Sequence, residues 1–241
     1  MFFYNEENSE VSEIQNPGPG VVTDSLALYL DAGEPTSYSG TGTTWTDLSG
    51  NGNDGTLNGV GFNSDNGGSL DFTGAGDFVL VNNSPSLQQS GDTTLQFTHY
   101  PQTLGSTRRS LAEKSFDEFI ITWEPGGKMN FYSYGGVTTI LANEYTPQAD
   151  QWFDVTIVRD LTNATIRYYI NGVLAKADPS PDAWGMTIPS SANVTNSNIK
   201  IGAGYLTDYY GRISRFMMYG KALSDAEVLQ NFEAVKDRYG L

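Results

Sequence analysis

Residues 152–175 read WFDVTIVRDLTNATIRYYINGVLA, and this stretch decides the fold class. Apolar and polar residues alternate over 152–159 and again over 165–170, which is the period of a half-buried β-strand. Asn171-Gly172 follows the second run, and this pair favours a two-residue hairpin turn because both residues tolerate positive φ. A third run over 173–175 completes the pattern. The stretch therefore predicts consecutive antiparallel strands.

Similar runs lie between turn signals along the rest of the chain, at 26–30, 69–72, 77–81, 93–97, 119–123, 129–132, 137–141, 198–202 and 211–219. No helical pattern alternates with them, so the sequence predicts an all-β protein with a two-sheet antiparallel sandwich or barrel of about a dozen strands or more. Three Gly-x-Gly stretches, at 40–42, 50–52 and 74–76, are interpreted as turns because none opens a helix after a strand.

One C-terminal α-helix is expected over 224–239. Ser224-Asp225-Ala226-Glu227 is a capping box, in which the first and fourth side chains satisfy each other's backbone amides. An apolar stripe at helical spacing follows, made of Val228, Leu229, Phe232, Val235 and Tyr239. We expect this stripe to dock on the sandwich.

Composition and charge exclude several classes of function. The 241 residues include no Cys and one His, His99, which excludes disulfides, thiolate metal sites and His-rich metal sites. The net charge is −15, and residues 1–107 carry 13 acidic residues and no Lys or Arg. Nucleic acid is not expected as a partner because phosphate binding draws its energy from basic side chains. Anionic membrane surfaces are disfavoured for the same reason.

Residues 1–20 are predicted to form an acidic N-terminal arm that ends in Asn16-Pro17-Gly18-Pro19-Gly20, and residues 21–241 to form the domain. The arm carries apolar and acidic side chains that cannot make a core alone, among them Phe2, Phe3, Tyr4, Glu6 and Glu7. We therefore expect an assembly element that contacts a basic surface. No basic, apolar export signal and no apolar run of about 18 residues is present, so neither export by the general route nor membrane insertion is expected.

The motifs together resemble a known family. They include Leu28-Tyr29-Leu30-Asp31-Ala32-Gly33, the run from Trp45 to Leu57, Gly68-Ser69-Leu70-Asp71-Phe72, and Tyr169-Ile170-Asn171-Gly172-Val173. This pattern resembles laminin-G-like domains of the concanavalin A-like lectin/glucanase fold over about residues 24–238. The resemblance implies a single jelly-roll domain, of a kind found in structural proteins of tailed phages. Such a fold serves lectins, hydrolases, adhesins and structural proteins, so it does not fix the function.

Hydrolysis is not expected. A retaining glycosidase needs two carboxyl groups about 5–5.5 Å apart. The i,i+2 acidic pair in this sequence is Asp225 and Glu227, which lies in the predicted helix cap. Nothing near His99 marks a catalytic nucleophile, and we interpret it as a strand-end or loop residue.

A structural Ca²⁺ ion is the one cofactor that the sequence suggests. Side-chain oxygens lie at alternate positions in Asp47, Ser49, Asn51 and Asn53, and Gly52 permits a bend, as in the first half of a calcium loop. Asx-turn chemistry is the alternative, because these side chains also bond their own backbone.

Two loops combine aromatic rings with polar groups, as sugar-binding sites do. One loop carries Trp184, and the other carries Tyr205, Asp208, Tyr209 and Tyr210. Subunit interfaces use the same residue types, so these are candidates for glycan contacts or for interface contacts.

We expect a non-enzymatic structural component of a virion, such as a decoration, fibre or appendage protein. Its partners would be other virion proteins and further copies of itself. A carbohydrate-binding or adhesion module outside the cell or at the cell surface, with a cell-surface glycan as its partner, is the alternative. A glycoside hydrolase ranks third. Glycan binding that is lost in Trp184→Ala would favour the alternative.

Overall fold

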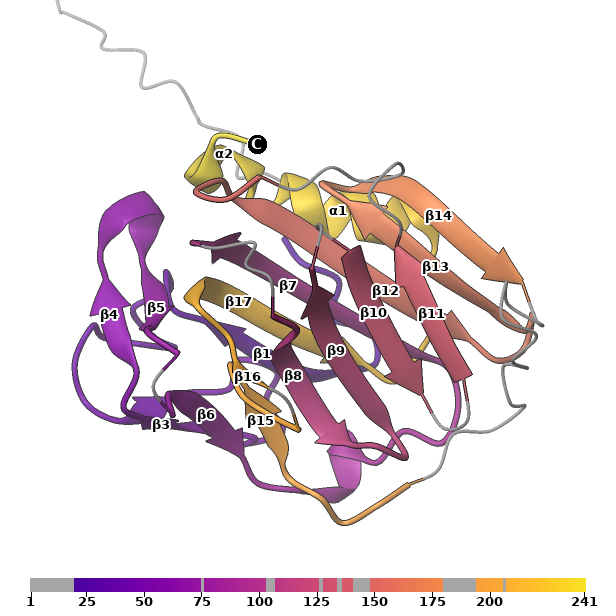
Figure 1. Ribbon diagram of the computed structural model, residues 1–241, viewed down its shortest axis with the longest axis horizontal. Helices are drawn as coiled ribbons and strands as arrows, with labels where there is room; N and C mark the ends of the chain where they lie inside the picture. The colour runs from indigo at the N-terminus through magenta and orange to yellow at the C-terminus, as the bar shows by residue number, and fades with distance from the viewer. Residues whose placement is uncertain are drawn as a thin grey trace, which may run out of the picture.

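A computed structural model of the protein describes residues 20–74, 76–102, 107–125, 128–133, 136–140, 148–179, 194–205 and 207–241. Within them the chain forms two β-sheets that pack face to face (Figure 1). The eight-stranded sheet is called sheet A. Its strands lie in the order β14 (Val173–Pro179), β13 (Thr165–Ile170), β12 (Phe153–Asp160), β7 (Thr93–Pro101), β17 (Gly211–Tyr219), β5 (Ser69–Phe72) and β4 (Gly61–Asn63). The eighth strand, β1 (Leu26–Asp31), also pairs with β17.

The nine-stranded sheet, called sheet B, has the order β11 (Gly136–Ile140), β10 (Lys128–Ser133), β9 (Phe119–Glu124), β8 (Arg109–Ser115), β15 (Ile199–Ile201), β6 (Phe78–Val81), β3 (Gly55–Asn58) and β2 (Thr44–Trp45). The short strand β16 (Thr207–Asp208) runs parallel to the start of β8, and the other strand pairs are antiparallel. Two 3₁₀ turns, η1 (Asp65–Gly67) and η2 (Pro85–Leu87), complete the loops. The predicted all-β antiparallel sandwich is confirmed.

The hairpin predicted from residues 152–175 is present as β12, β13 and β14. Asn171 and Gly172 have φ of 49° and 74°, so both central residues of the turn adopt the left-handed conformation that matches the twist of the strands. The backbone amide of Asp154 donates to Asn171 Oδ1 at 2.9 Å, which ties the turn to the neighbouring strand. The turn residues thus set the register of three strands.

The core lies between the inner faces of the two sheets. Phe97 and Phe216 from sheet A stack at a centroid distance of 6.4 Å, and Ile121 and Trp123 come from sheet B. His99 also lies here, buried in β7, so its interpretation as a strand-end or loop residue is wrong. Its Nδ1 lies 3.0 Å from the Tyr209 hydroxyl. Burial lowers the pKa of His99 to about 3, so the ring is neutral at physiological pH.

The C-terminal segment forms two helices, α1 (Asp225–Glu233) and α2 (Lys236–Tyr239), that cover the outer face of sheet A, the face turned away from the core. The predicted capping box at Ser224 and Glu227 is confirmed. Leu229 differs from the prediction, because it is 44% exposed on the solvent side of α1. Phe232 is buried against the hairpin turn at Gly172. No helix in the described part of the chain is long and apolar enough to cross a membrane.

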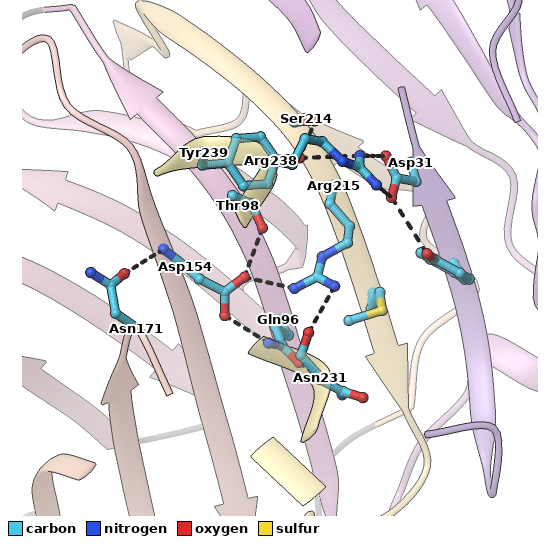
Figure 2. Close-up of polar contacts among 12 residues, drawn as sticks. Asp31, Gln96, Thr98, Asp154, Asn171, Ser214, Arg215, Asn231, Arg238 and Tyr239 are labelled. Atoms are coloured by element: carbon cyan, nitrogen blue, oxygen red, sulfur yellow. Dashed lines mark hydrogen bonds and ion pairs between the residues drawn. The ribbon is translucent and has the colours of Figure 1, made fainter. Parts of the chain in front are cut away.

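A buried polar cluster joins α1 to sheet A (Figure 2). The carboxylate of Asp154 accepts hydrogen bonds from Gln96, Thr98 and Arg215, each at 2.7 Å. Asn231 of α1 donates to Gln96 Oε1 at 2.9 Å, and its backbone carbonyl accepts from Arg215 at 3.2 Å. The helix is therefore held in place by directional polar contacts as well as by apolar packing.

Candidate functional site

The outer face of sheet B carries a hollow over strands β8, β9 and β10, which we call the aromatic hollow. Its lining consists of Arg108, Phe116, Ile120, Thr122, Tyr132 and Tyr205. Phe116 is 65% exposed and Tyr205 is 78% exposed, although both rings are large and apolar. Exposed rings gathered around one hollow are a feature of binding surfaces.

Strand alternation places the polar groups of the hollow on the outer face. In β9, Ile121 and Trp123 point into the core, so Thr122 and Glu124 point outward. The neighbouring strands set Ser110 and Asn130 directly opposite Thr122. The accessible lining of the hollow is mostly apolar, and Ser110, Thr122 and Asn130 lie buried beneath it.

An ion pair neutralises the charge in this region. Arg108 Nε donates to Glu124 Oε2 at 2.5 Å, and Thr122 Oγ1 donates to Glu124 Oε1 at 2.6 Å. The hydrogen bond to Glu124 raises the pKa of Arg108 above its ordinary value. As an ion pair, the two groups contribute no net charge to the hollow.

The turn after β15 positions Tyr205 at the rim of the hollow. Gly202 has φ of 87°, and a Cβ there would lie 2.2 Å from the Phe72 ring, so only glycine fits this close approach. The backbone amide of Tyr205 then donates to Glu113 Oε2 at 2.6 Å. A core contact and a strand carboxylate thus hold the exposed ring beside β8.

Aromatic rings beside hydrogen-bonding groups suit a ligand with both apolar faces and hydroxyls. A ring face packs against C–H groups, and Arg108, whose side chain is 46% exposed, supplies donors for directional bonds. Thr122 and Glu124 are buried beneath it and hold it in place. Sugars have this combination of surfaces. The hollow is small, so it would hold no more than one ring of a larger ligand.

Of the sequence-predicted loop residues that the structure describes, the aromatic hollow contains Tyr205 alone. Tyr209 is 1% exposed, so its selection as a ligand-binding residue is corrected. Strand β17 begins two residues later, and the Tyr209 ring packs in the core against Phe72 and His99. The side chain therefore has no exposed face for a sugar.

Asp208, the last residue of β16, and Tyr210 both contact the turn between β5 and β6. Asp208 Oδ2 accepts from the Gly76 amide at 3.0 Å, and its backbone carbonyl accepts from Arg109 at 2.8 Å. The guanidinium of Arg109 stacks on the Tyr210 ring, 5.9 Å from its centroid. These contacts give both residues structural roles. Trp184 and the arm residues Phe2, Phe3, Tyr4, Glu6 and Glu7 lie outside the described residues.

The predicted calcium loop is bonded to β1. The Asp47 carboxylate accepts four hydrogen bonds, from the amides of Tyr29, Ser49 and Asn53 and from the Ser49 hydroxyl. Asn51 and Asn53 turn their Nδ2 groups toward the Ala27 carbonyl. These are the contacts of the Asx-turn alternative, and calcium would have to displace the four donors to reach Asp47.

The acidic residues considered for catalysis have other partners. Asp225 binds Arg167 and Tyr169 at the start of α1, and Glu227 closes the capping box. Glu118 pairs with the buried Lys114 at 2.6 Å. Among the described residues, no three His, Asp or Glu side chains gather as metal ligands.

Sequence reasoning missed most of the aromatic hollow, namely Phe116, Ile120, Thr122 and Tyr132, together with the adjacent Glu124. The alternation over 119–124 assigns Ile120, Thr122 and Glu124 to one strand face, which is a usable signal. The order of strands in sheet B brings β8, β9 and β10 under the loop that carries Tyr205. That order is not readable from local sequence.

Comparison with known proteins identifies the family. Residues 72–229, which are 158 of the 241 residues, match the model of the Concanavalin A-like lectin/glucanases superfamily. A search of curated proteins finds no match.

Three solved structures illustrate the likeness. One is the ligand binding domain of botulinum neurotoxin serotype D in complex with N-acetylneuraminic acid, with a TM-score of 0.64, 16% identity, and coverage of 88% of this chain and 51% of that chain. Another is the binding domain of Paraclostridial Mosquitocidal Protein 1, with a TM-score of 0.66, 18% identity, and coverage of 87% of this chain and 52% of that chain. The third is domain 4 of AbnA, a GH43 extracellular arabinanase from Geobacillus stearothermophilus, in complex with arabinotriose. Its TM-score is 0.63, with 15% identity and coverage of 86% of this chain and 98% of that chain.

The chain spans about half the length of the two toxin binding domains and nearly the whole of the arabinanase domain. At these identities the structural likeness shows the shared fold alone. The family match and the sandwich agree, and the chain belongs to the concanavalin A-like lectin/glucanases superfamily.

Proposed function

We propose that this protein is a carbohydrate-binding module that holds a sugar ring in the aromatic hollow. The observation that carries the proposal is the juxtaposition of the exposed Phe116 and Tyr205 rings with the hydrogen-bonded group of Arg108, Thr122 and Glu124. Rings remove the apolar face of a sugar from water, and the exposed guanidinium of Arg108 offers hydrogen-bond donors to its hydroxyls. The complexes of two relatives with arabinotriose and N-acetylneuraminic acid support this class of ligand.

The module is proposed to bind without catalysis. On the outer face of sheet B, Glu113 lies opposite Ile120, four residues from Glu124 along β9. Four residues of strand span about 13 Å, which exceeds the roughly 5–9.5 Å between the carboxyl pairs of glycosidases. The location in a virion and the contacts with virion proteins stay predictions from the sequence.

Glycan binding is tested first on an array of neutral and charged glycans, and then by isothermal titration calorimetry with the best ligands. Tyr205→Ala is expected to weaken binding by about tenfold or more, as truncation of an interface anchor does. Tyr205→Phe keeps the ring and is expected to retain most of the affinity. Leu229→Ala removes another exposed apolar side chain, on the opposite side of the molecule, and serves as the control.

Two outcomes would contradict the proposal. The absence of any glycan ligand for the folded protein would remove the function. Full affinity in Tyr205→Ala together with lost affinity in Trp184→Ala would keep glycan binding but move the site to the other predicted loop.

A further inference from the structure

The first 19 residues have a composition that complements the aromatic hollow. They lie outside the described residues, and in sequence they place three aromatic side chains, Phe2, Phe3 and Tyr4, just before two acidic ones, Glu6 and Glu7. No Lys or Arg occurs among them. A short segment of this kind buries its rings only against another surface, and the surface that it fits is apolar with positive charge beside it.

The aromatic hollow offers the apolar surface. Phe116 and Tyr205 are its most exposed rings, and its accessible lining is mostly apolar. The hollow has room for one side-chain ring, which would meet the faces and edges of the rings around it. Exposed aromatic side chains and arginines also anchor protein interfaces, so a ring on a peptide suits this surface.

Positive charge lies at one end of the hollow. The Arg108 side chain is 46% exposed, whereas its partner Glu124 is 9% exposed. Lys128 of β10 lies directly opposite Glu124 in the strand pair and is exposed. Two accessible cations therefore share one buried carboxylate, which leaves a net positive charge at this end.

The arm begins at a fixed point on the far side of the molecule. The Gly20 carbonyl accepts from Gln230 of α1 at 2.7 Å, and the Val22 amide donates to Asn231 Oδ1 at 2.7 Å. The Tyr219 hydroxyl donates to the Val22 carbonyl at 3.1 Å. These contacts tie the root of the arm to the helices on sheet A, across the sandwich from the aromatic hollow.

The position of this root favours the hollow of another molecule. Phe3 and Gly20 are 17 residues apart, and a fully extended chain of that length spans roughly 60 Å. To reach its own hollow, the arm would have to wrap around the edge of both sheets in a nearly extended form. A second copy can present its hollow to the arm directly.

We propose that residues 2–7 of one copy dock in the aromatic hollow of a second copy. An aromatic ring of the arm lies among the exposed rings of the hollow, and the acidic pair that follows lies beside Arg108 and Lys128. The arm and a sugar ring then compete for one surface, so self-association regulates glycan binding. The docking stands on the arm and the hollow alone, and only its effect on glycan binding rests on the proposed function.

Sedimentation velocity of the full chain over a range of concentrations tests the docking. The wild-type chain is expected to self-associate. The arm variant Phe2→Ala/Phe3→Ala and the hollow variant Tyr205→Ala are each expected to weaken association about tenfold or more. Their combination should lose little more than either alone, because both remove the same contact. Leu229→Ala, on the outer side of α1, is the control and should associate as the wild type does.

A charge exchange tests the acidic pair. Glu6→Lys/Glu7→Lys and Lys128→Glu should each weaken association, and one chain that carries all three changes should recover it, because the charges on arm and hollow are then reversed together. Added salt should weaken the wild-type complex. All of these variants alter the arm or an exposed side chain, so equal melting temperatures are expected and will check the fold.

The effect on glycan binding is measured by calorimetry with the best glycan ligand at increasing protein concentration. The affinity per chain is expected to fall as the wild type associates and to stay constant in Phe2→Ala/Phe3→Ala. A synthetic peptide of residues 1–16 should displace the glycan and dissociate the complex, since all three bind the same hollow.

The outcomes separate the two proposals. If the wild-type chain stays monomeric at every concentration, or if association is unchanged in both the arm variant and Tyr205→Ala, the docking is wrong and the carbohydrate-binding function stands. If the charge exchange restores nothing, the contact with Arg108 and Lys128 is wrong. If association requires both the arm and the hollow but no glycan binds, the docking stands and the carbohydrate-binding function fails.

Discussion

Removal of the Asp154 carboxylate is expected to destabilise the protein strongly. Arg215 and Asp154 are almost fully buried, and their ion pair is 2.7 Å long. Asp154→Ala leaves the Arg215 cation without its counter-charge, which costs about 3–5 kcal/mol when a buried pair loses one partner. Gln96 and Thr98 also lose their acceptor, at about 1–3 kcal/mol for each donor left unsatisfied. A loss of this size is a large fraction of the roughly 5–15 kcal/mol that stabilises a native domain.

Urea unfolding followed by circular dichroism measures this loss. The double variant Asp154→Leu with Arg215→Met removes both charges and is expected to be more stable than Asp154→Ala, because no buried charge remains unpaired. A destabilisation below about 1 kcal/mol in Asp154→Ala would refute the reasoning. So would a double variant that loses the sum of the two single losses, because independent sites add and a coupled pair does not.

Four further outcomes are expected. Phe232→Ala should cost about 3–5 kcal/mol in urea unfolding, whereas Leu229→Ala, on the exposed side of the same helix, should cost little. Because burial lowers the pKa of His99 to about 3 from an ordinary 6.5, the stability that its neutral ring contributes is fully present above pH 6.5. It should fall by up to about 1.4 kcal/mol per pH unit as the pH drops from there toward 3, and His99→Gln should show a smaller slope in melting temperature against pH. Added calcium should leave the melting temperature unchanged because four donors occupy the Asp47 carboxylate, and a rise that disappears in Asp47→Ala would restore the calcium site. Deletion of residues 1–19 should leave the domain folded and weaken oligomerisation in sedimentation velocity, and unchanged assembly would remove the role predicted for the arm.

Local pattern predicted those parts of the fold that local chemistry dictates. The alternation over 165–170 and 211–219 gave strands with the observed bounds, and the Asn171-Gly172 turn was found from two residues. Strand β8 was missed, because Arg109–Ser115 carries three charged residues in seven and lacks the apolar alternation of its neighbours. Its burial is imposed by pairing with β9, the next strand along the chain, and with β15, which is distant in sequence.

The candidate site was less predictable than the fold. Tyr209 and Tyr210 are adjacent in sequence, yet one is a core residue and the other stacks on Arg109. Strand β17 begins directly after Tyr210, and neighbouring side chains in an extended chain point to opposite sides. The partners of Tyr205, by contrast, come from β8, β9 and β10, so their meeting depends on strand order and register. Leu229 shows the same limit in a helix, where the apolar stripe predicted from sequence was wider than the face that sheet A covers.

The meeting of the two ends of the described chain has a consequence for how the module can be built into larger assemblies. The Gly20 carbonyl accepts from Gln230 of α1 at 2.7 Å, the Val22 amide donates to Asn231 at 2.7 Å, and Leu241 packs beside α2. Both ends thus lie with the helices on the side of sheet A, across the sandwich from the aromatic hollow. Linkers attached at either end would leave the outer face of sheet B open in each copy of a tandem array. Such an array would hold a polysaccharide by avidity even when each single copy binds weakly.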